Sequence, residues 1–267
     1  MTQLGEMVAV VVGKEELTCP FPHNDRESKL QNKMKNSSSS LKRKLNTESQ
    51  NGAELHLPHM RKTTTDMDSS DPNDKIMKYN PHHIFPGNAS WPETDLLNWI
   101  DKSAEKTKVK GDIGYDVNGY RNGIDLPSSN HLRGNWTGRG EQFQNDYAIA
   151  SIEADGGKRQ FHDSHSAYSD FAKEALDKIA AKIKMILMPD RGCGDDKCSA
   201  KSNEKYPPPI KILPRIESAS GRLARKLHGD PTKWQIPVMT SKFSLIYKLK
   251  ITQKEAVDKL SPDNFKY

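Results

Sequence analysis

Five polar residues at four separate places form the pattern in this sequence with the clearest chemical potential. They are His82, His83, Asn122, His162 and His165. Hydrolysis of a phosphodiester needs a cation at the scissile phosphate, a base that activates water, and a group that holds this base in one tautomer. Imidazole and amide side chains can supply all three, so we expect these residues to form one hydrolytic site.

Short elements are expected to position this set. His82 and His83 belong to an extended segment, because Pro81 and Pro86 bracket four residues and exclude a helix. Asn122 begins a turn that leads into a strand at 124–126. A helix from about 164 to 187 follows, and its apolar residues recur at three- and four-residue spacing: Phe171, Ala175, Leu176, Ile179, Ile183 and Ile186.

In these motifs the chain resembles the AHH group of the HNH/endonuclease VII superfamily, nucleases that are common among bacterial toxins. The resemblance covers roughly residues 76–190. It lies in Pro81–Asn88 (PHHIFPGN), in Asn122–Pro127 (NGIDLP) and in His162-x-x-His165-x-x-Tyr168. It implies an α+β fold with a ββα-metal (His-Me finger) core, additional helices and a polar, partly disordered N-terminal region.

The resemblance also implies roles for the site residues. His82 would bind the metal, His83 would be the general base, and Asn122 would hydrogen-bond this base. His165 would bind the metal from the helix, and His162 is a candidate third ligand because residues three apart on a helix share a face.

One departure from the family pattern affects these roles. Pro81 replaces the alanine that gives the group its name. Adjacent side chains on a regular strand point to opposite faces, so His82 and His83 serve one site only if the backbone is irregular there. On a regular strand one of the two would be structural and the roles could be exchanged.

The residue types leave the metal open. Imidazole ligands suit Zn²⁺, Ni²⁺ or Mn²⁺, whereas Mg²⁺ prefers oxygen and keeps its waters. Nucleases of this kind nevertheless often use Mg²⁺, since the phosphate supplies oxygens. We expect Mg²⁺ first and Zn²⁺ second.

Positive charge is concentrated at the C-terminal end of the chain. Residues 199–267 contain 14 Lys and Arg against 6 Asp and Glu, a net charge of +8, whereas the whole chain carries +6. A helix predicted near 216–227 places Arg222, Arg225 and Lys226 where they could contact nucleic-acid phosphates. The alternative is an ordinary solvated basic surface.

Three cysteines are too few for a disulfide framework. Cys193 and Cys198 could form half of a structural zinc site, a disulfide after export, or a pair of free thiols. No stretch approaches the roughly 20 apolar residues that span a bilayer. The apolar run Met7–Val12 is short and follows Glu6, so it does not read as a secretory signal.

Composition suggests four regions. Residues 1–24 are expected to form a small N-terminal adaptor that contains a buried strand at Met7–Val12. Residues 25–75 are polar and are predicted to be a flexible linker. Residues 76–190 would form the AHH/HNH-like nuclease domain, and residues 191–267 a basic extension packed on it.

These observations predict a metal-dependent endonuclease that acts on DNA rather than RNA. By resemblance it would be an antibacterial toxin, a type VI secretion effector, with a cognate immunity protein and a secretion-machine partner at its N-terminus. It would be made in the bacterial cytoplasm without a Sec signal and act in target cells. The alternatives are a non-enzymatic nucleic-acid-binding module with a structural zinc site, and a housekeeping restriction or repair nuclease.

Overall fold

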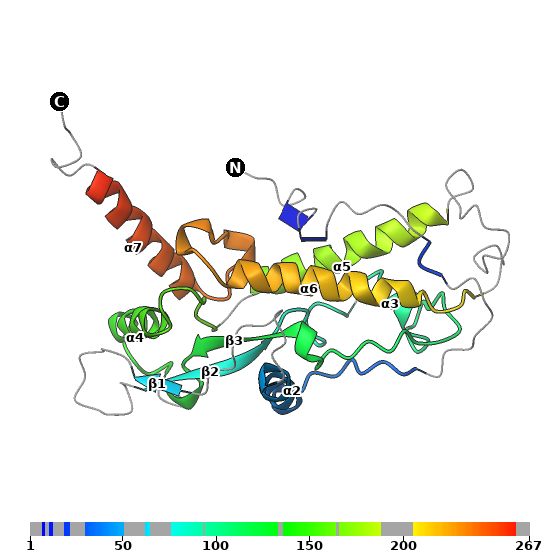
Figure 1. Ribbon diagram of the computed structural model, residues 1–267, viewed down its shortest axis with the longest axis horizontal. Coiled ribbons are helices and arrows are strands. Elements are labelled where there is room, and N and C mark those ends of the chain that lie inside the picture. Colours follow the sequence, from blue (N-terminus) through cyan, green and yellow to red (C-terminus); the bar gives the residue numbers. More distant parts are fainter. Residues whose placement is uncertain are drawn as a thin grey trace. The chain divides into compact units, whose positions relative to one another are not determined.

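The computed structural model shows an α+β protein, as predicted (Figure 1). It describes residues 7–8, 11–12, 19–21, 30–50, 62–64, 76–92, 94–132, 136–163, 166–187 and 205–259. The helices are α2 (Ser38–Gln50), α3 (Leu97–Ile100), α4 (Glu141–Ala154), α5 (Ser166–Ile186), α6 (Leu213–Leu227) and α7 (Lys242–Lys259), and the strands are β1 (Lys62–Thr64), β2 (Ile76–His83) and β3 (Gly123–Ser128).

The three strands form one sheet in the order β1-β2-β3. β1 and β2 are antiparallel, with Lys62 opposite Lys78 and Thr64 opposite Ile76. Every residue of β3 is buried, which explains why this strand does not alternate between polar and apolar residues. The second motif of the sequence therefore lies inside the protein.

The chain divides into two compact units. Unit 1 comprises Met1–Leu57, His83–Ile124 and Ser169–Ala224, and unit 2 comprises Pro58–His82, Asp125–Tyr168 and Arg225–Tyr267. This division differs from the domain boundaries expected from the sequence. Each unit draws on three separated segments of the chain.

Unit 1 contains the apolar face of α5 that the sequence predicted. Phe171, Ala175 and Ile179 are each at most 1% exposed. Two polar contacts attach α5 to the segment that follows the histidine pair: Ser90 Oγ donates to the Ser169 carbonyl at 3.1 Å, and the Asp95 amide donates to Asp177 at 2.8 Å. The predicted helix at 164–187 is thus confirmed to within two residues at its described ends.

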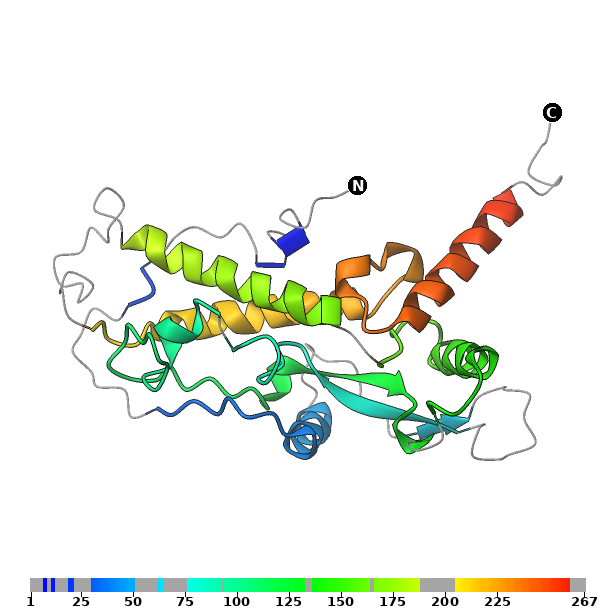
Figure 2. The ribbon, with the colours of Figure 1, turned by 180° about the vertical axis from the view of Figure 1, so that it is seen from behind.

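In unit 2, α4 and α7 pack against each other (Figure 2). This unit also has an aromatic core. The largest side chains of this core are Trp136, Tyr147, Phe161, Trp234 and Phe243. Beside it lies a buried ion pair, in which Arg159 Nη1 is 2.8 Å from Asp155 Oδ1 and both side chains are at most 5% exposed. Tyr79 of β2 also donates to this carboxylate, at 2.6 Å.

Two expectations for the N-terminal region are wrong in the part of the chain that is described. Met7, Val8, Val11 and Val12 are helical and buried, whereas a strand was predicted. Their spacing places all four on one helical face, and burial of that face prevails over the β preference of valine. The N-terminal adaptor role assigned to 1–24 is not tested by this finding.

The second correction concerns 25–75, which was expected to be a flexible linker. Within it the chain forms α2 and β1. Leu41 and Leu45, one helical turn apart, are 0% and 5% exposed, and Leu41 packs so closely on Gly123 that a Cβ there would lie 2.5 Å from Leu41 Cδ1. Burial of these two leucines stabilises the helix, although the composition around them is polar.

No helix in the described part of the chain combines the length and apolar character needed to cross a membrane.

Candidate functional site

Both histidines at the end of β2 are buried, with 3% of His82 and 7% of His83 exposed. Their surroundings differ, because His82 belongs to unit 2 and His83 to unit 1. The two consecutive imidazoles thus have different described neighbours, Asn118 for His83 and the rings of His162 and Tyr168 for His82.

The imidazole of His83 is held by an asparagine that the sequence analysis did not select. His83 Nε2 lies 3.0 Å from Asn118 Oδ1. The orientation of the Asn118 amide is fixed by two further bonds: Oδ1 accepts from the Ser37 amide at 2.7 Å, and Nδ2 donates to the Lys35 carbonyl at 2.9 Å. Since Oδ1 can only accept, His83 Nε2 must carry the proton and Nδ1 keeps its lone pair.

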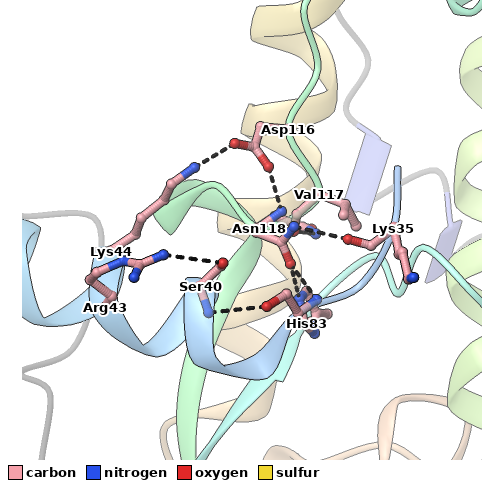
Figure 3. A network of polar contacts seen from close by, with 10 residues as sticks. Lys35, Ser40, Arg43, Lys44, His83, Asp116, Val117 and Asn118 are labelled. Atoms are coloured by element: carbon pink, nitrogen blue, oxygen red, sulfur yellow. Dashed lines mark hydrogen bonds and ion pairs between the residues drawn. The ribbon is translucent and has the colours of Figure 1, made fainter. Parts of the chain in front are cut away.

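Charged groups hold Asn118 from its other side (Figure 3). The backbone N–H of Asn118 donates to Asp116 Oδ1 at 2.9 Å. The second carboxylate oxygen of Asp116 is paired with Lys44 Nζ of α2. The network therefore runs from Lys44 through Asp116 and Asn118 to His83, and every member belongs to unit 1.

Burial determines the charge state of His83. It lowers the pKa of this imidazole below the usual value of 6.5, because a charged ring would lose solvation, and the bond to Asn118 offsets only part of this effect. At pH 7 the ring is neutral and has an unprotonated Nδ1. This is the form that a general base requires.

Asn122 holds backbone rather than the base, which corrects the contact expected for it. Its Oδ1 accepts from the Phe85 amide at 2.8 Å, and its Nδ2 donates to the carbonyls of Phe85 and Val117 at 3.0 and 2.8 Å. The Ile84 amide also donates to the Asn122 carbonyl. Asn122 therefore fixes the backbone that follows His83, while Asn118 bonds the ring. A sequence signal existed, because Asn118-Gly119 is a second Asn-Gly pair four residues earlier.

In unit 2, His82 lies beside two residues of the third motif. The His82 ring centre is 4.9 Å from that of His162 and 4.9 Å from that of Tyr168. His162 is placed by its amide, which donates to the Pro127 carbonyl at 2.7 Å at the end of β3. Tyr168 is in the first turn of α5 and is fully buried, which raises its pKa well above 10. The end of β2 thus lies beside the start of the long helix.

The same pair provides a test of whether the residues fit a metal ion. The His82 and His162 rings meet edge-on, with an interplanar angle of 61°, and imidazole nitrogen is a common ligand of Zn²⁺. Among the described residues no three His, Cys, Asp or Glu side chains form a group that could hold a metal. His165, the further expected ligand, lies outside the described residues, as do Cys193 and Cys198.

The basic residues predicted to contact nucleic acid lie on α6. Arg225 is exposed, whereas Arg222 and Lys226 are half-buried, and Lys226 Nζ donates to Gln235 at 3.4 Å. Arg225 and Lys226 occupy the last turn of the helix, where positive charge also stabilises the helix dipole.

Unit 1 has a pocket with an empty volume of about 450 Å³, which is lined by residues of the loop on both sides of Asn118 and by residues of α6. Arg121 and Glu217 form an ion pair at its wall, 3.5 Å apart. Partial burial raises the pKa of Glu217 above its usual value, and Arg121 opposes this shift. Ser220 of α6 donates to the Arg121 carbonyl at 2.6 Å, so α6 supports the loop that carries Asn118.

Comparison with known proteins found no match to this chain among protein-family models, curated proteins or solved structures.

Proposed function

We propose that this protein is a metal-dependent endonuclease that hydrolyses phosphodiester bonds in nucleic acid, DNA rather than RNA. The observation that carries the proposal is His83: a buried, neutral imidazole whose Nε2 proton is held by Asn118 Oδ1 at 3.0 Å and whose Nδ1 is unprotonated. Such a group can remove a proton from water at neutral pH.

His83 performs the proton transfer in this mechanism. Nδ1 accepts a proton from a water molecule while the oxygen of that water bonds to phosphorus. The bond between phosphorus and the sugar oxygen of the leaving strand then breaks. The ring becomes a cation, which Asn118 Oδ1 stabilises because it still accepts the Nε2 hydrogen. Since burial disfavours this cation, His83 then passes its proton to solvent or to the leaving oxygen and recovers its basic form.

His82 and His162 would hold the metal, with His165 as the further ligand that the resemblance implies. A bound Mg²⁺, or alternatively Zn²⁺, Ni²⁺ or Mn²⁺, would neutralise charge on the phosphate in the transition state. Tyr168, packed on His82, would keep that ring in one orientation. A ββα-metal core is proposed from the order of the motifs along the chain: His82 lies in β2, Asn122 directly precedes β3, and Tyr168 lies in the first turn of α5.

The biological role is proposed on the resemblance alone. The protein would be an antibacterial toxin delivered by type VI secretion into target cells, loaded through its N-terminal residues and neutralised by an immunity protein in the cell that makes it. Arg222, Arg225 and Lys226 are retained as candidate phosphate contacts.

The test is cleavage by the full-length protein. Plasmid DNA and total RNA are incubated with purified protein in Mg²⁺, Zn²⁺ or EDTA, and the assay is repeated with His83→Ala and with Lys178→Gln as a matched surface control. We expect cleavage that requires a divalent metal, is lost in His83→Ala and is unchanged in the control. Cleavage that persists in EDTA or in His83→Ala would refute the mechanism.

A further inference from the structure

A basic segment runs beside the candidate base, in a region where the sequence predicted a linker. Residues 30–46 contain five cations and no acidic residue. The cations are Lys33, Lys35, Lys42, Arg43 and Lys44. We refer to residues 32–44 as the basic segment. It consists of an extended stretch, residues 32–37, and the first two turns of α2.

The extended stretch is tied to the loop that carries Asn118. The Lys33 amide donates to the Tyr115 carbonyl at 2.8 Å, and the Val117 amide donates to the Lys33 carbonyl at 2.9 Å. Asn32 adds three side-chain bonds, since its Oδ1 accepts from the amides of residues 114 and 115 and its Nδ2 donates to the Ile100 carbonyl at 2.7 Å. The backbone of the segment is therefore fixed from one side.

The turn that follows His83 fixes the other side. Asn36 Oδ1 accepts from the Gly87 amide at 2.6 Å, and a Cβ at Gly87 would lie only 2.0 Å from the Met34 carbonyl oxygen. Met34 and Asn36 are half-buried, whereas Lys33 and Lys35 are exposed. The alternation along an extended chain thus directs two lysines outward from a backbone that is anchored on both sides.

The charges of the segment are divided between two uses. Lys44 is paired with Asp116 and so supports Asn118. The side chains of Lys33, Lys35, Lys42 and Arg43 are exposed, and within the described part of the chain the ammonium groups of the three lysines form no ion pair. Four cations of the basic segment are therefore exposed. The same segment bonds Asn118 through the Lys35 carbonyl and the Ser37 amide, and Asn118 bonds His83.

We infer that the basic segment binds the phosphate backbone of nucleic acid and brings a phosphodiester to His83. The inference rests on the proposed function, and it names a substrate surface different from α6. Fixed, exposed cations at a spacing set by the backbone suit a polyanion, because binding releases condensed counterions. A membrane surface fits less well, since the apolar residues of α2, Leu41 and Leu45, are buried and leave no face to enter lipid.

The test measures binding separately from cleavage. Full-length protein with His83→Ala is titrated with duplex DNA, single-stranded DNA and RNA at 50–200 mM salt, alone and with Lys33→Gln/Lys35→Gln. The matched control is Lys106→Gln/Lys178→Gln, which removes the same charge from exposed lysines of unit 1 outside the basic segment. Loss of two phosphate contacts makes the slope of log K against log salt shallower by about 2 for duplex DNA. Raising the salt from 50 to 200 mM therefore weakens binding by a factor that is roughly tenfold smaller for the Lys33/Lys35 variant than for its parent. The control keeps the wild-type slope.

The results separate the two proposals. If the Lys33/Lys35 variant changes the slope but the wild type cleaves nothing, the nuclease proposal fails and the binding surface stands. Cutting rates are measured with the same two variant pairs in protein that keeps His83. If the wild type cleaves and both variant pairs keep the same slope and the wild-type cutting rate, the basic segment is not the substrate surface. Absence of binding to any nucleic acid, or equal effects of the two variant pairs, also overturns the inference.

Discussion

Two substitutions at Asn118 should move the pKa of His83 in opposite directions. Asn118→Asp keeps an acceptor beside His83 Nε2, 3.0 Å away in the native protein, but gives it a negative charge. Asn118→Leu removes the acceptor. The native bond to Asn118 raises the pKa of His83 while burial lowers it, so loss of the bond should lower the pKa further.

The size of the upward shift follows from distance and burial. Opposite charges in direct contact in a partly buried site shift a pKa by roughly 1–3 units, and each unit corresponds to about 1.4 kcal/mol. His83 is 7% exposed, so solvent screens little of this interaction. The Asp variant also gives up the donation to the Lys35 carbonyl, which costs about 1 kcal/mol of folding stability.

The assay is an NMR titration of the labelled histidine rings, with His83 assigned by its absence in His83→Gln. We expect the His83 midpoint to rise in Asn118→Asp and to fall in Asn118→Leu. If the protein is a nuclease, the acid limb of its pH–rate profile should move the same way, because protonated His83 cannot act as a base. Midpoints that move together, or do not move, would refute the assigned tautomer and contact.

Three further predictions concern folding stability. Arg159→Met should lower the free energy of unfolding, measured by denaturant titration, by about 3–5 kcal/mol, since it leaves the buried Asp155 carboxylate without its cation. The control is Lys250→Met, which removes an exposed ion pair with Glu153 and should cost under about 1 kcal/mol in the same titration. Gly87→Ala should lower the free energy of unfolding by about 1–3 kcal/mol, because the added Cβ would overlap the Met34 carbonyl. Amide hydrogen exchange at residues 33–37 should become faster in this variant, and unchanged exchange would contradict the packing of Gly87 on Met34. Acidification below pH 6.5 should destabilise the wild type more than His83→Gln. The His83 ring takes up its proton near pH 6.5 in the unfolded chain and only at lower pH in the folded protein, so the free energy of unfolding decreases as the pH is lowered from 6.5 towards the folded pKa. Equal losses between pH 7.5 and 5.5 would contradict this.

Periodicity and local chemistry determined the elements that could be predicted from the sequence. The recurrence of apolar residues predicted α5, because the apolar face of an amphipathic helix is the face that it buries. Pro81 and Pro86 marked the extended end of β2 in the same local way. The resemblance also selected His82 and His162, whose rings prove to lie 4.9 Å apart.

Tertiary structure decided which neighbour holds His83 and which parts of the polar N-terminal region are ordered. Asn118 and Asn122 are both followed by glycine, and only the backbone path determines that the first contacts the ring and the second contacts Phe85. Leu41 stabilises α2 through Gly123, some eighty residues away in the chain. Such long-range contacts leave no periodic pattern, because the partners share neither a helix face nor a strand, and the burial they produce outweighs local composition and propensity.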